Sequence, residues 1–154
     1  MLVVGLGNPI LTDDGVGWQV VNLLRQALPC SASHQLITAC VGGLSLAEML
    51  VGHDRVIIVD AIITGQVAPG TIHRFDLTSL PGTLNSTSAH DTNLATAIST
   101  LRRLGAPLPE DRHIQFVAVE AFDVWTFSEE CSPPVQQSLP LAVDMVVRLL
   151  HQEE

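Results

Sequence analysis

Short apolar runs alternate along the chain with longer segments whose apolar residues recur every three or four positions. Such runs are typical of buried strands, and the longer spacing is typical of helices that pack one face against a core. The strongest run, residues 56–59, is β-branched throughout, which predicts a central strand buried on both faces. Weaker strands are expected over residues 2–6, 35–39, 71–77 and 113–119.

Four segments with helical spacing separate or follow these strands. Thr12 or Asp13 can cap the first helix, and Pro29 ends it. The others are a short helix over 44–50, one over 94–104 that ends at Gly105, and a final helix after Pro133 and Pro134, with Pro140 either kinking it or lying in its first turn.

Strands that alternate with helices predict an α/β fold. We expect one domain over residues 1–154, with three layers (α/β/α) and a mainly parallel central sheet of about five strands, of the phosphorylase/hydrolase-like kind. The alternating polar and apolar residues of 71–77 indicate an edge strand, which we expect to be antiparallel.

Composition narrows the class of protein. The chain is 47% hydrophobic and 15% charged, which argues against disorder, and its net charge of −9 argues against nucleic-acid binding. Neither a membrane-length apolar segment nor a signal peptide is visible, so we expect a cytoplasmic protein. Cys30, Cys40 and Cys131 form no CxxC pair and are odd in number, which favours buried free thiols over a disulfide framework or zinc site.

Candidate chemistry follows the ends of the predicted strands. In open α/β sheets the functional crevice lies beyond the carboxyl ends of the strands. Asp13 and Asp14 follow the first strand, Asp60 is predicted to end the central strand, and His90 lies in the loop before the third helix. Two carboxylates and an imidazole make a plausible divalent metal site with open positions. Each residue also has a purely structural interpretation. Asp13 and Asp14 can start a helix, Asp60 can cap the turn after its strand, and His90 can be an exposed polar residue.

Other kinds of site have weaker support. Gly5 and Gly7 begin like a dinucleotide fingerprint, but Ile10 stands where the third glycine belongs. The chain has neither a Walker loop nor a G-x-S-x-G nucleophile turn. A dyad of Cys40 with a histidine stays open, although no spacing favours it.

Taken together, the motifs resemble those of hydrogenase maturation proteases, in the same order and over nearly the whole chain. The matching residues are Gly5-Leu6-Gly7-Asn8, Thr12-Asp13-Asp14-Gly15-Val16-Gly17, Val56-Ile57-Ile58-Val59-Asp60-Ala61, Pro69-Gly70-Thr71, Ser88-Ala89-His90-Asp91, Phe127-Ser128-Glu129-Glu130 and Ser132-Pro133.

The resemblance implies a function and a set of metal ligands. It implies an endopeptidase that recognises nickel already loaded into the precursor of a nickel–iron hydrogenase large subunit and removes the C-terminal extension. The implied ligands are Asp14, Asp60 and His90; the substrate supplies the nickel, and other divalent ions can occupy the same ligands. Some relatives carry glutamate at the first position, and many carry an Asp-Gly-Gly-Thr run where this chain has Cys40-Val41-Gly42-Gly43.

Three other functions remain as alternatives. A nickel-binding chaperone or module would use the same ligands without cutting a peptide bond. An aminopeptidase-like metal hydrolase would hold its own ion. A peptidyl-tRNA hydrolase also opens with Gly-Leu-Gly-Asn-Pro, but this chain has no tyrosine and no histidine between Asn8 and His34, and its acidic surface suits RNA poorly.

Overall fold

The computed structural model describes residues 1–28, 34–79 and 94–152 and contains a five-stranded sheet. The strands are β1 (Leu2–Leu6), β2 (Gln35–Ala39), β3 (Val56–Ile62), β4 (Ile72–Asp76) and β5 (Ile114–Glu120), in the spatial order β2-β1-β3-β5-β4. All neighbours are parallel except β4, which pairs antiparallel with β5 at one edge. The predicted mainly parallel sheet with one antiparallel edge strand is confirmed.

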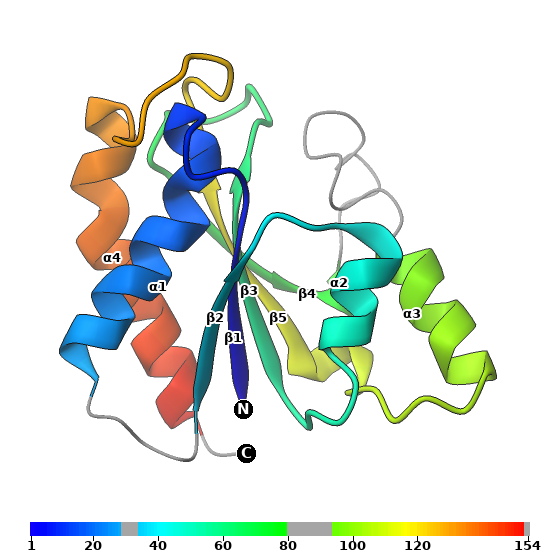
Figure 1. The fold of residues 1–154 in the computed structure, drawn as a ribbon. Helices are drawn as coiled ribbons and strands as arrows, with labels where there is room; N and C mark the ends of the chain where they lie inside the picture. Colours follow the sequence, from blue (N-terminus) through cyan, green and yellow to red (C-terminus); the bar gives the residue numbers. More distant parts are fainter. Residues whose placement is uncertain (29–33, 80–93, 153–154) are drawn as a thin grey trace.

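Helices cover both faces of the sheet, as Figure 1 shows. One face carries α1 (Val16–Ala27) and α4 (Pro133–His151), and the other carries α2 (Gly43–Met49) and α3 (Leu94–Arg103). Short 3-10 turns lie at η1 (Thr12–Gly15), η2 (Leu77–Ser79) and η3 (Asp111–His113). The three-layer α/β/α prediction is therefore confirmed. None of the described helices combines the length and apolar character that a bilayer crossing requires.

The central strand β3 explains how the core divides. All seven of its residues are buried, because a parallel strand between two helical layers has no solvent face. Ile57 and Val59 belong to the cluster under α1 and α4, whereas Val56 and Ile58 belong to the cluster under α2 and α3. Side chains alternate along a strand, so Asp60 faces the same side of the sheet as Ile58.

Several boundaries differ from the sequence predictions. β3 continues two residues past Asp60, since Ala61 and Ile62 keep pairing with β5. The strand β5 likewise extends to Glu120. Pro140 lies inside α4, beyond its first turn, at an exposed position where water can reach the carbonyl group that loses its helical donor.

Candidate functional site

The start of α1 lies directly on the carboxyl ends of β1 and β3. A Cβ atom built on Gly17 would stand 2.4 Å from the carbonyl oxygens of both Leu6 and Val59. Only glycine permits this approach, because any side chain would overlap the backbone. Asp14 lies three residues before Gly17, and Asp60 directly follows Val59. The fold therefore brings these two predicted site residues to the same edge of the sheet, which we call the carboxyl rim.

The turn after β1 fixes Asp14. Its side chain is half-buried, and Oδ2 accepts a hydrogen bond of 2.7 Å from the backbone N–H of Asn8. Gly7 has φ of 113°, and a Cβ atom there would stand 1.7 Å from the carbonyl oxygen of Asp14. The glycine of the predicted turn thus allows the chain to close tightly around this carboxylate.

Asp60 is buried on the face of the sheet that carries α2 and α3. Its Oδ1 accepts a hydrogen bond of 2.8 Å from the backbone N–H of Ala61. In the sheet register Asp60 pairs with Ala118, which in turn pairs with His73 on β4. A carboxylate on one strand and an imidazole two strands away therefore lie in one row, separated by a small residue.

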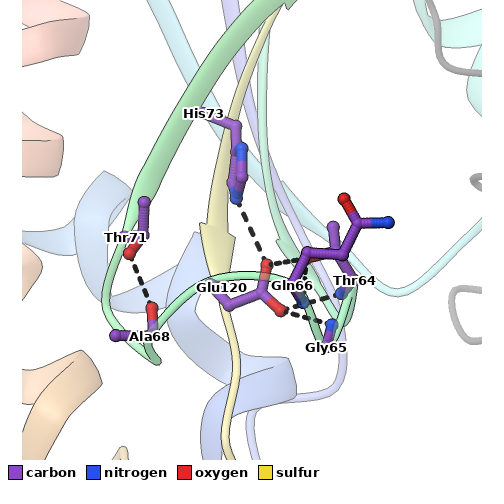
Figure 2. Close-up of polar contacts among 7 residues, drawn as sticks. All are labelled: Thr64, Gly65, Gln66, Ala68, Thr71, His73 and Glu120. Carbon is purple, nitrogen blue, oxygen red and sulfur yellow. Dashed lines mark hydrogen bonds and ion pairs between the residues drawn. The ribbon is translucent and has the colours of Figure 1, made fainter.

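Sequence analysis missed Glu120, another buried carboxylate at this rim. As Figure 2 shows, Oε1 accepts hydrogen bonds from the backbone N–H groups of Thr64 (2.8 Å) and Gly65 (3.0 Å), and Oε2 accepts one from the Thr64 hydroxyl (2.9 Å). Nε2 of His73 lies 3.2 Å from the same Oε2. Glu120 thereby fixes the segment between β3 and β4 beside the rim. An acidic residue directly after the predicted buried strand 113–119 was the available signal.

Asp13 has a structural role rather than the predicted capping role. It is fully buried, and its two carboxylate oxygens accept four hydrogen bonds. The donors are the backbone N–H groups of Phe122 (2.8 Å), Asp123 (3.0 Å) and Ser132 (2.7 Å), and the Ser132 hydroxyl (2.8 Å). The Thr12 hydroxyl also turns away from the helix, donating to the carbonyl oxygen of Thr126. The prediction that one of them caps α1 is therefore wrong.

His90, the third predicted ligand, lies outside the described residues, so the structure places two of the three. Asp14 and Asp60 supply the hard carboxylate oxygens that divalent ions accept as ligands. Within residues 1–28, 34–79 and 94–152, no three His, Cys, Asp or Glu side chains form a metal-binding group.

Comparisons with known proteins agree on one family. The family model described as hydrogenase maturation protease matches residues 18–149. The chain belongs to the hydrogenase maturation protease family. The match contains Asp60 and His90, while Asp14 precedes it.

Individual relatives of the maturation protease family match most of the chain. It is 32% identical over 106 residues to the hydrogenase 2 maturation protease of Escherichia coli K12. This alignment covers 68% of this chain and 65% of that relative. A putative hydrogenase maturation protease of Methanocaldococcus jannaschii is 29% identical over 154 residues, covering 97% of this chain and 93% of its own length. The chain thus spans slightly under two thirds of the Escherichia coli relative.

A solved structure supports the same fold. The hydrogenase maturating endopeptidase HybD from Escherichia coli superposes with a TM-score of 0.80 at 29% identity, covering 97% of this chain and 90% of that chain. The expected maturation-protease architecture therefore holds for the sheet and its helices.

The cysteines of this maturation-protease-family chain divide into two environments. Cys131 is buried, and burial, together with the carboxylate of Asp13, raises the pKa of its thiol to about 12. Cys40 is exposed, so the expectation of a buried thiol is confirmed for Cys131 and wrong for Cys40. Cys30 lies outside the described residues. A thiol with so high a pKa is a poor nucleophile at neutral pH.

Proposed function

We propose that this protein is an endopeptidase that removes the C-terminal extension from the nickel-loaded precursor of a nickel–iron hydrogenase large subunit. Family membership supports the general activity. The observation that carries the specific proposal is the position of Asp14 and Asp60 at one rim of the sheet, where α1 presses on the ends of β1 and β3.

In this proposal the nickel ion belongs to the substrate. Asp14, Asp60 and His90 complete its coordination when the precursor docks, so the protease acts only on a subunit that already holds nickel. Carboxylate and imidazole are suitable ligands for this purpose. A metal held next to the scissile peptide polarises its carbonyl group or lowers the pKa of a bound water towards 7.

The exposed thiol supports a cytoplasmic location for this reaction. Cys40 is an exposed free thiol, which suits the reducing conditions of the cytoplasm. We therefore place the reaction there, before any export of the hydrogenase.

The test is cleavage of a purified nickel-loaded precursor by matched variants. Asp60→Asn keeps an oxygen that can accept the hydrogen bond from Ala61 but removes the negative charge, and His90→Ala removes the imidazole. We expect both to lower kcat/KM by at least about 10³-fold while the melting temperature stays near that of the wild type. Asp144→Asn, on the exposed side of α4, is the control and should cleave normally.

Normal processing by either site variant would refute the ligand assignment. A nickel-binding chaperone would leave the large subunit at full length even with the wild-type protein, so gel mobility and mass separate that alternative from proteolysis.

A further inference from the structure

Three large aromatic side chains are exposed on one short segment of the carboxyl rim. Phe122, Trp125 and Phe127 are 70%, 73% and 78% exposed, and all lie between β5 and α4. The chain has only four Phe and two Trp residues, so half of its aromatic side chains are exposed on this segment. Ile10 is 46% exposed, and its carbonyl oxygen accepts a hydrogen bond from Ser128 of the same segment. We call these four side chains the rim patch.

The backbone beneath the rim patch is held in place. Asp13 binds the segment at both ends, through Phe122 and Asp123 at its start and Ser132 at its close. Within it, Oδ1 of Asp123 accepts hydrogen bonds from the N–H groups of Trp125 (2.8 Å) and Thr126 (3.0 Å). An ordered segment loses little conformational entropy on binding, which favours a docking surface. Exposed aromatic clusters on a rigid scaffold are also typical of interface centres.

Charge is distributed unevenly between the two ends of the sheet. All seven basic residues of the chain are arginines, and every one is described. Six of them lie just before a strand or in the last turns of helices that run back to the amino ends of the parallel strands: Arg25, Arg55, Arg102, Arg103, Arg112 and Arg148. The seventh, Arg74, lies in the middle of β4. Arg55, for example, donates to the carbonyl oxygen of Gln152 just past α4, and Arg74 donates to the Gln152 side chain.

Acidic residues at the amino end pair with arginines there, as Asp111 does with Arg102, whereas the carboxyl rim carries acidic residues beside the rim patch and none of the seven arginines. Asp123 lies within the aromatic segment, and Glu129 and Glu130 are exposed just after it. Asp14 and Asp60 lie at the same rim. Figure 1 shows the segment in gold above the start of α4, at the end of the sheet opposite the N-terminus and the last turn of α4. An apolar, acidic surface complements a partner that presents apolar and basic side chains.

We propose that the rim patch docks the hydrogenase large-subunit precursor through a surface segment carrying arginine or lysine beside apolar side chains. This rests on the proposed function and deepens it. Asp13 anchors the patch and adjoins Asp14 in the chain, so a precursor whose scissile peptide reaches Asp14 and Asp60 also lies across the patch. A second copy of this chain is a poor occupant, because two acidic rims placed face to face repel each other.

The test compares two exposed positions with a matched control. The double variant Trp125→Ser/Phe127→Ser removes two aromatic side chains from the rim patch and leaves the proposed ligands Asp14, Asp60 and His90 unchanged in sequence. Leu104→Ser is the control, since Leu104 is 77% exposed just after α3, at the opposite end of the sheet. With nickel-loaded precursor as substrate, we expect the double variant to raise KM about 10- to 100-fold with kcat nearly unchanged. The control should match the wild type.

Ionic strength tests the charge part of the proposal. The wild-type KM should rise several-fold between low salt and about 0.3 M salt, and Glu129→Gln with Glu130→Gln should flatten that dependence. A salt-independent KM would overturn the requirement for a basic partner segment.

Binding measurements separate this proposal from the proteolytic one. Precursor is captured on immobilised Asp60→Asn protein, with and without the two rim substitutions. If the rim substitutions abolish binding, docking is supported even when the wild-type protein cleaves nothing. Absence of cleavage by the wild type would refute only the proteolytic function. The docking surface would be overturned if the double variant cleaved the precursor with the same KM as the wild type and bound it equally well. It would also be overturned if the wild-type protein were a dimer and the double variant a monomer, because the patch would then join two copies of this chain.

Discussion

Asp13 shows how one buried carboxylate can organise a functional edge. It accepts four hydrogen bonds, two of them fully buried ones from Ser132 and two partly buried ones from Phe122 and Asp123, and a buried donor left without an acceptor costs more than a lost hydrogen bond. Asp13 thereby fixes the segment between β5 and α4, whereas its neighbour Asp14, the candidate ligand, is held by the backbone N–H of Asn8.

We expect Asp13→Ala to lower the free energy of unfolding by about 3–5 kcal/mol, because three backbone N–H groups and the Ser132 hydroxyl lose their acceptor. Asp13→Asn keeps one acceptor oxygen and should lose less. Urea unfolding with linear extrapolation gives both values. Asp144→Ala, exposed on α4, should change stability by less than about 0.5 kcal/mol. Equal stability of Asp13→Ala and the wild type would show that the four bonds contribute little.

Cysteine reactivity should follow the two environments. At pH 8 a thiol with the pKa of Cys131, about 12, is ionised in only ~10⁻⁴ of molecules, and its sulfur is also buried. Iodoacetamide should therefore alkylate Cys40 in the native protein and leave Cys131 unmodified, as peptide mass spectrometry would show. In concentrated urea both should react. Rapid native labelling of Cys131 would contradict its burial.

At the scale of elements, the contact between α1 and the strand ends is the geometric basis of the site. Alanine normally stabilises a helix relative to glycine by about 1 kcal/mol. Gly17→Ala should instead destabilise the protein by about 2 kcal/mol or more, because its Cβ would overlap two carbonyl oxygens. Thermal unfolding measures the effect. Gly105→Ala, with φ of 86° but open space around it, should cost only about 1 kcal/mol. A stabilised Gly17→Ala protein would disprove the close approach.

The elements also show which sequence signals were sufficient. The β-branched run 56–59 and the helical spacing of the long segments were sufficient to predict a strand and helices. A strand buried on both faces and a helix buried on one side each leave a local pattern of apolar residues. Strand ends were less predictable. Pairing with β5 carries β3 past Asp60, and no local signal near Asp60 reports a partner strand more than 50 residues away.

At the scale of the whole molecule, the site is only partly readable from sequence. The pair Asp13-Asp14 and Asp60 were found because acidic residues follow apolar runs, and the family resemblance selected Asp14 from the pair; the fold brings Asp14 and Asp60 to one rim. The part played by Asp13 was not found, because its donors lie 109 to 119 residues further along the chain. The exposure of Phe122 and Trp125 was missed as well, and Phe127 entered only through the family resemblance, since scattered aromatic residues in a loop have no periodicity.

The long-range bonds of Asp13 also fix when the protein can become competent during synthesis. Its donors leave the ribosome more than a hundred residues after it does. At about 5–20 residues per second, the N-terminal strand waits roughly 5–25 s for them. A nascent chain lacking Ser132 therefore leaves Asp13 without two of its four hydrogen bonds, and a truncated translation product would lack the fixed rim patch with which to engage a precursor.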